Sequence, residues 1–153
     1  MPTLDDVYRK FGETAEAAQL LETELGNMLF ATRCMDEDLL VNQNPAHASD
    51  ILDSVDWHTL GQLLKALGNH TQSLEALDGQ FAKARDARNR LSHSFYRKHN
   101  FRRNTEDGRA QMLEDLEAMH SALLDAYKAV FAIRGIDLDQ MADMPLPTRH
   151  VPI

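Results

Sequence analysis

The sequence predicts an all-α fold, a bundle of four to five helices, and three observations support this. Apolar residues recur at helical spacings of three, four and seven in several stretches of the chain. No segment shows the alternating pattern rich in β-branched residues that is typical of a strand. With 153 residues, the chain is long enough to bury one hydrophobic core without disulfides or a structural metal.

The first predicted helix covers about residues 4–34. Thr3 is its expected N-cap, and Asp5 and Asp6 lie at the positive end of the helix dipole. The expected inner stripe consists of Leu4, Val7, Tyr8, Phe11, Ala15, Ala18, Leu21, Leu25, Met28 and Leu29. Residues 41–50 (VNQNPAHASD) are expected to form a loop because of their Asn, Pro, Ala and Ser content.

Two further helices are expected between this loop and the closing helix. The first is expected to begin at a cap formed by Asp53 or Asp56 and to end near Gly68. Its apolar face carries Leu60, Leu63, Leu64 and Leu67. The second is expected to run from about residue 73 to about residue 97, and a basic loop is expected over residues 98–104.

A long closing helix follows, with Asn104 as the expected N-cap and Asp107 at the third helical position. Its stripe consists of Met112, Leu116, Met119, Leu123, Tyr127 and Val130. Gly135 is a natural residue to follow its C-cap. We therefore divide the chain into a helical bundle at residues 1–135 and a tail at 136–153. The tail holds three of the five prolines, and we expect it to be extended along the surface or disordered.

Composition narrows the classes of function. The net charge of −8 and pI near 5.3 argue against a protein that coats nucleic acid non-specifically. Cys34 is the single cysteine, which excludes an internal disulfide and fits a reducing cytoplasm, the expected location. The first residues lack the pattern of a signal peptide, and no apolar stretch reaches the roughly 20 residues needed to span a membrane.

One stretch departs from this acidic background. Residues 83–103 contain eight Lys or Arg and one acid, Asp86, so this window carries +7 and the rest of the chain −15. Arg88 also falls on an apolar stripe formed by Leu77, Phe81, Ala84, Leu91 and Phe95. Because a guanidinium cannot lose its charge, Arg88 on this face requires an anionic partner or a ligand.

Metal and phosphate-loop chemistry find little support in the sequence. It contains no Gly-rich phosphate loop and no paired cysteines for zinc. Glu117 and His120 match half of the carboxylate-bundle iron signature, but that signature needs a second such pair and two more inward glutamates. A solvated helix face is the simpler interpretation, and we expect no metal and no cofactor.

The segment Arg88-Asn89-Arg90-Leu91-Ser92-His93 resembles the R-x4-6-H motif of HEPN domains. The polar position after the arginine is Asn89, and the helical outline around the motif is HEPN-like. The resemblance implies a metal-independent endoribonuclease of the toxin or antiviral effector type. It also implies a homodimer with two facing motifs and an antitoxin or other inhibitory partner protein. One branch carries a modified tyrosine two residues after the histidine. Here that position is Phe95, and Tyr96 comes one place later.

The residue chemistry is compatible with this resemblance. Cleavage of RNA through its own 2′-hydroxyl requires proton transfer, which suits His93, and stabilisation of phosphate charge, which suits Arg88. Asn89, one helical turn before His93, is positioned to orient the imidazole. We therefore predict Arg88, Asn89 and His93 as catalytic residues. The RNA-binding residues are expected to be Arg85, Tyr96, Arg97, Lys98, Arg102 and Arg103.

The motif needs two chains to form one site. Residues five apart on a helix point about 140° away from each other, so Arg88 and His93 of one chain converge poorly on one phosphate. In a two-fold dimer, Arg88 of one chain can approach His93 of the other. The alternative is a non-catalytic module that binds RNA or a nucleotide, or a protein-interaction module. A catalytic dimer should place the three motif residues in one open cleft, whereas an interaction module should bury them in intramolecular ion pairs.

Overall fold

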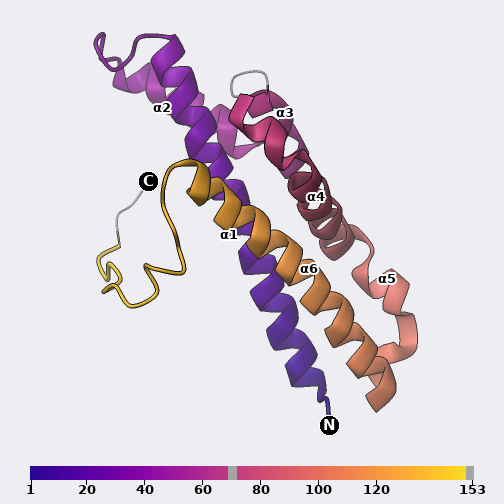
Figure 1. Cartoon of the computed structure of the whole chain (residues 1–153). Helices are drawn as coiled ribbons and strands as arrows, with labels where there is room; N and C mark the ends of the chain where they lie inside the picture. The colour runs from indigo at the N-terminus through magenta and orange to yellow at the C-terminus, as the bar shows by residue number, and fades with distance from the viewer. Residues whose placement is uncertain (69–71, 151–153) are drawn as a thin grey trace.

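The computed structural model describes residues 1–68 and 72–150. In this part of the chain every regular element is a helix, which confirms the predicted all-α bundle. Figure 1 shows the α-helices and their order. The elements are α1 (Leu4–Asp36), α2 (Pro45–Asp56), α3 (Leu60–Gly68), the 3₁₀ helix η1 (Gln72–Leu77), α4 (Asp78–His93), α5 (Phe95–His99), the 3₁₀ helix η2 (Asn100–Asn104) and α6 (Glu106–Ile133).

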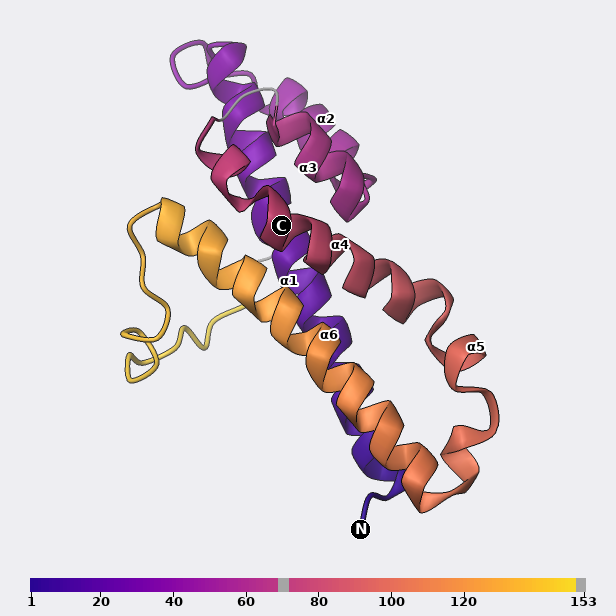
Figure 2. The same ribbon diagram turned by 45° about the vertical axis from the view of Figure 1, so that its right-hand side comes forward.

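The two longest helices, α1 and α6, pack against each other and run in the same direction, as Figures 1 and 2 show. Near their beginnings, Arg109 donates to the carbonyl oxygen of Pro2 at 2.7 Å. At the C-terminal end of α6, Arg134 pairs with Glu24 in the second half of α1. Buried side chains of both helices belong to one hydrophobic core, including Val7, Leu21, Leu25, Leu29, Met112, Leu116, Met119, Leu123 and Val130.

The basic helix α4 runs antiparallel to α1 and α6 and packs against both. Phe81, Ala84, Ala87 and Leu91 form its buried face. At its C-terminal end the chain passes into α5, where Phe95 lies against Phe11 of α1 with ring centroids 5.5 Å apart. This packing fixes the position of the predicted motif on α4.

Helix α2 covers the second half of α1, where Gly26 allows a close crossing. A Cβ atom on Gly26 would lie 3.3 Å from Cγ1 of Val55. The prediction of a loop over residues 41–50 is wrong beyond Asn44, because α2 begins at Pro45. Asn44 caps the helix by accepting from the backbone N–H of His47 at 3.2 Å, and proline suits the first helical turn.

The predicted start of α3 is also wrong. Asp53 and Asp56 belong to α2, so neither caps the next helix. Thr59 does so instead: its hydroxyl accepts from the backbone N–H of Gln62, and its own N–H donates to the Gln62 side chain at 2.8 Å. This reciprocal pair is a capping box. Leu60, Leu63 and Leu67 are buried, as the stripe predicts.

The helix predicted over residues 73–97 is divided into η1, α4 and α5. The chain leaves helical geometry at Ser94, with φ −137° and ψ −2°. The predicted basic loop is also more ordered than expected, because residues 100–104 form η2. Asn100 has φ 33°, a conformation in which Asn is one of the more tolerant residues. The chain thus turns back toward α6.

Both long helices have well-formed ends. Thr3 and Asp6 form a capping box at the start of α1, as predicted for Thr3. Helix α6 is capped by Thr105 rather than Asn104, since the Thr105 hydroxyl accepts from the N–H of Gly108 at 3.1 Å. Gly135 follows the C-cap with φ +75°, and the N–H of Ile136 reaches the carbonyl oxygen of Phe131 at 3.1 Å. This is the Schellman arrangement expected for glycine after a helix end.

Two features lie outside the core. Tyr8 was expected on the inner stripe of α1 but is 45% exposed, because its hydroxyl accepts from Arg103 instead of packing inward.

The tail after α6 has no helix or strand up to residue 150, and residues 151–153 lie outside the described chain. None of the helices in the described chain combines the length and apolar character that a membrane crossing requires.

Candidate functional site

The first predicted catalytic residue, Arg88, lies between α4 and α1. Its Nε donates to Oε1 of Glu22 at 2.8 Å, and the two side chains are 22% and 23% exposed. Glu22 is therefore the anionic partner that the apolar surroundings of Arg88 require. Only Nε takes part in this bond, so the terminal guanidinium nitrogens retain their donors.

The other two motif residues face solvent. Asn89 and His93 are both exposed, and His93 is the last residue of α4. Four residues separate them, so they lie one turn apart on the same side of the helix. Within the described chain, no hydrogen bond joins Arg88 to either of them. The single chain thus places Asn89 and His93 together and turns Arg88 toward α1.

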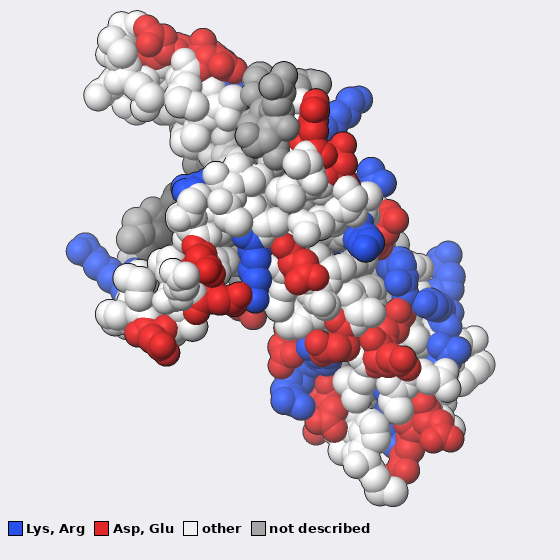
Figure 3. Space-filling view, in the orientation of Figure 1, with Lys and Arg blue, Asp and Glu red and all other residues white. Residues whose placement is uncertain are grey.

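The predicted RNA-binding residues divide into two groups. Three lie on the surface without a strong partner in the described chain: Arg85 is 3.7 Å from the neighbouring Asp86, Arg97 is exposed, and Tyr96 is 42% exposed. Tyr96 packs one ring edge against Phe95, with centroids 5.2 Å apart. Figure 3 shows Lys and Arg gathered along the edge formed by α4 and α5, with acidic side chains beside them over α6.

The second group is engaged within the chain. Lys98 lies 3.3 Å from a carboxylate oxygen of Asp115, and Arg102 lies 3.1 Å from Nδ1 of His99. Arg103 donates to the hydroxyl of Tyr8 at 2.8 Å. Lys98 therefore joins α5 to α6 and Arg103 joins η2 to α1, whereas the Arg102 bond lies within the segment formed by α5 and η2. All three cations remain at the surface, but each must give up or share a contact in order to bind a phosphate.

Asp115 is the centre of this network, and the sequence did not single it out. It accepts hydrogen bonds from Arg90, from Lys98 and from Nε2 of His99, the last at 2.8 Å. Burial acts to raise the pKa of Asp115, but the hydrogen bonds from Arg90 and His99, with the charge of Arg90 and the Lys98 contact, lower it to about 2. Asp115 is therefore ionised at neutral pH.

His99 is the buried partner of Asp115, with a relative exposure of 2%. Its ring lies against Phe95, with centroids 4.6 Å apart. Sequence reasoning missed it because residues 98–104 were predicted to form a basic loop. One signal was present: His99 follows the buried Phe95 by one helical turn, so it falls on the same inner face.

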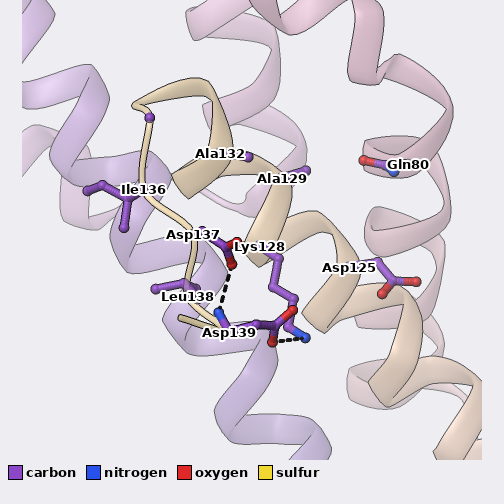
Figure 4. A pocket seen from close by; sticks show the side chains of 10 residues that line it. Gln80, Asp125, Lys128, Ala129, Ala132, Ile136, Asp137, Leu138 and Asp139 are labelled. Carbon is purple, nitrogen blue, oxygen red and sulfur yellow. Dashed lines mark hydrogen bonds and ion pairs between the residues drawn. The ribbon is translucent and has the colours of Figure 1, made fainter. Parts of the chain in front are cut away.

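Two pockets lie away from the motif. One, of 460 Å³, opens between the C-terminal half of α6, Gln80 and the chain after Gly135 (Figure 4). There Lys128 binds Asp139 at 2.8 Å, and this hydrogen bond raises the pKa of Lys128. A second pocket, of 610 Å³, lies between α1, α2 and α3 and includes Glu22 in its wall. Glu22 is thus both the partner of Arg88 and part of this pocket's lining.

Glu117 and His120 on α6, which match half of the carboxylate-bundle iron signature, both contact a lysine of α1. Lys10 contacts Glu117, and its Nζ lies 2.9 Å from Nδ1 of His120. The pair is thus part of the contact between α1 and α6. Within the described ranges, no three His, Cys, Asp or Glu side chains are grouped as metal ligands.

In comparisons with known proteins, no family model, no curated protein and no solved structure matches this chain.

Proposed function

We propose that this protein is a metal-independent endoribonuclease of HEPN type that cleaves RNA at a site shared between two chains. The observation that carries the proposal is the pairing of exposed Asn89 and His93 on one turn of α4, beside a basic surface. His93 takes the proton of the 2′-hydroxyl as the 2′-oxygen bonds to phosphorus and the bond from phosphorus to the 5′-oxygen breaks, and the leaving 5′-oxygen gains a proton from the imidazolium or from water. Asn89 orients the imidazole. Arg85 and Arg97 hold the RNA backbone, and Tyr96 offers an aromatic face to a base.

Arg88 supplies the positive charge at the scissile phosphate. Glu22 binds its Nε and leaves the two terminal nitrogens as donors, so the guanidinium can be held from behind while it faces an oxyanion. Because Arg88 and His93 do not meet within one chain, each site takes Arg88 from one protomer and His93 from its partner. Light scattering should therefore report about twice the 17.3 kDa chain mass. An antitoxin-like inhibitor would bind over this shared site.

A cleavage assay tests the chemistry. The wild-type protein should cut RNA in EDTA and leave 2′,3′-cyclic phosphate and 5′-hydroxyl ends, because the nucleophile belongs to the substrate. His93→Ala should lower the rate by roughly 100-fold or more, whereas His150→Ala, an exposed histidine in the tail, should not change it. Cleavage that requires a divalent metal, or that proceeds equally on 2′-O-methyl RNA, would contradict the proposal.

One observation favours a second candidate, a non-catalytic RNA-binding or protein-interaction module. Arg88, Lys98 and Arg102 all engage partners within the chain, as expected of residues that stabilise the fold. Such a module should bind RNA or a partner protein without cutting RNA, and His93→Ala should leave that binding intact. The same assay therefore separates the two functions.

A further inference from the structure

A small pocket next to the motif has an unusual distribution of charge. It has a volume of 370 Å³ and lies between α5, η2 and α6. One side is formed by Lys98, His99 and Arg102, and the other by Gln111, Glu114 and Asp115. The buried imidazole of His99 thus lies at the wall of a cavity that also has basic and acidic side chains in its lining.

Each ring nitrogen of His99 has its own partner in this arrangement. A guanidinium can only donate, so the contact between NH1 of Arg102 and Nδ1 of His99 at 3.1 Å makes Nδ1 an acceptor. On the other side of the ring, Nε2 donates to Asp115 at 2.8 Å. The imidazole of His99 is thus oriented by a buried carboxylate on one side and contacts Arg102 on the other.

Cations outnumber carboxylates in this arrangement: Arg90, Lys98 and Arg102 face Asp115 and Glu114. Asp115 is shared by Arg90 and Lys98, and the described chain pairs Arg102 with the ring of His99 rather than with a carboxylate. Only one of the guanidinium nitrogens of Arg102 is used in that bond. Lys98 is 53% exposed on its side chain and 3.3 Å from Asp115, so it can turn toward a second anion at little cost.

We propose that this pocket binds a phosphate group through Arg102 and Lys98. The guanidinium fork matches two phosphate oxygens, and the ammonium adds a third donor. When Arg102 turns to the phosphate, Nδ1 of His99 loses its donor, so the imidazole reports occupancy of the site. Glu114 is the opposing charge at the rim. Binding at this pocket does not require the ribonuclease activity proposed above, and the two are measured separately.

The test uses the full chain, labelled with ¹⁵N in its histidines and titrated with inorganic phosphate. We expect saturable binding and a change at Nδ1 of His99 that follows the same curve. Arg102→Gln should weaken binding by about tenfold or more, and Lys98→Gln by a few-fold. Glu114→Gln should tighten binding by a few-fold because it removes a repulsive charge. Lys83→Gln, which removes an exposed charge from α4, is the matched control and should have no effect.

Two further titrations distinguish the sources of the phosphate. A dinucleoside phosphate, whose only phosphate is a diester, should reproduce the His99 change if the pocket holds the RNA backbone. A nucleoside monophosphate alone will do so if it holds a terminal or free phosphate. The proposal is overturned if Arg102→Gln binds as tightly as the wild type, or if Lys83→Gln weakens binding equally. It is also overturned if none of the three ligands changes the His99 resonances.

Discussion

Arg88 donates its Nε–H to Oε1 of Glu22 at 2.8 Å, and this bond joins α4 to α1. The position of Arg88 on an apolar stripe predicted an anionic partner or a ligand, and Glu22 is that partner. Removal of Arg88 would leave the carboxylate of Glu22 half-buried without its donor.

We therefore predict that Arg88→Ala lowers the free energy of unfolding by roughly 1–3 kcal/mol. A double variant, Arg88→Met with Glu22→Gln, should recover most of this loss because neither charge remains. Urea denaturation of the two variants measures the difference. If Arg88→Ala is as stable as the wild type, the ion pair does not contribute to stability.

Acid should weaken the contact between the basic segment and α6. The pKa of Asp115 is lowered to about 2 from 3.8, so its ionised form favours the folded state. Its contribution is complete above pH 4 and is lost as the pH falls through the range between these two pKa values. This amounts to about 2 kcal/mol.

Asp115→Asn provides the comparison. The variant should be less stable than the wild type at pH 6, and the difference in unfolding free energy should shrink as the pH falls from about 4 to about 2. Chemical denaturation at a series of pH values measures it. A difference in unfolding free energy that stays constant over this pH range would show that the charge of the Asp115 carboxylate does not stabilise the fold.

Two glycines on the long helices should respond in opposite directions to the same substitution. A Cβ atom on Gly108 would lie 2.1 Å from the backbone oxygen of Arg102, so Gly108→Ala must displace η2 from the start of α6. A Cβ atom on Gly12 would meet nothing within 4 Å. Gly12→Ala should stabilise the protein by up to about 1 kcal/mol through helix propensity.

We expect Gly108→Ala to destabilise the protein by several kcal/mol, in the range of large single-residue effects. Thermal unfolding of the two variants gives the comparison directly. Equal melting temperatures for Gly108→Ala and the wild type would mean that η2 does not pack against α6 as described.

The salt dependence of RNA binding should change more on loss of a basic residue without an ion pair than on loss of one that already contacts a carboxylate. Arg97 makes no ion pair in the described part of the chain, whereas Lys98 already contacts Asp115. Arg97→Gln should reduce the slope of log affinity against log salt by about 1, and Lys98→Gln by less. Fluorescence anisotropy with a short RNA measures both slopes. A larger change for Lys98→Gln would reverse this ranking.

The sequence predicted those parts of the structure that depend on local periodicity. The stripes of α1, α3, α4 and α6 are buried or partly buried, apart from Tyr8, and Thr3 and Gly135 stand at the helix ends as expected. The division of the third helix could not be predicted in this way. It depends on the turn at Ser94, which allows Phe95 to pack on Phe11.

The same limit applies to the candidate site. The need of Arg88 for an anionic partner followed from its position on the stripe, but α1 carries several glutamates and only the helix crossing selects Glu22. Asp115 and His99 belong to different elements 16 residues apart, so their contact depends on the fold of α5 and η2. The exposure of Asn89 and His93 agrees with their place on the polar side of α4.

The central claim is that one site takes Arg88 from one chain and His93 from the other, and a mixing experiment tests it directly. Arg88→Ala and His93→Ala should each be inactive alone. If chains exchange freely after mixing in equal amounts, half of the dimers contain one of each variant, and every mixed dimer has one intact composite site. Cleavage should therefore return to about a quarter of the wild-type rate. If the mixture stays inactive while light scattering shows mixed dimers, the composite site does not exist.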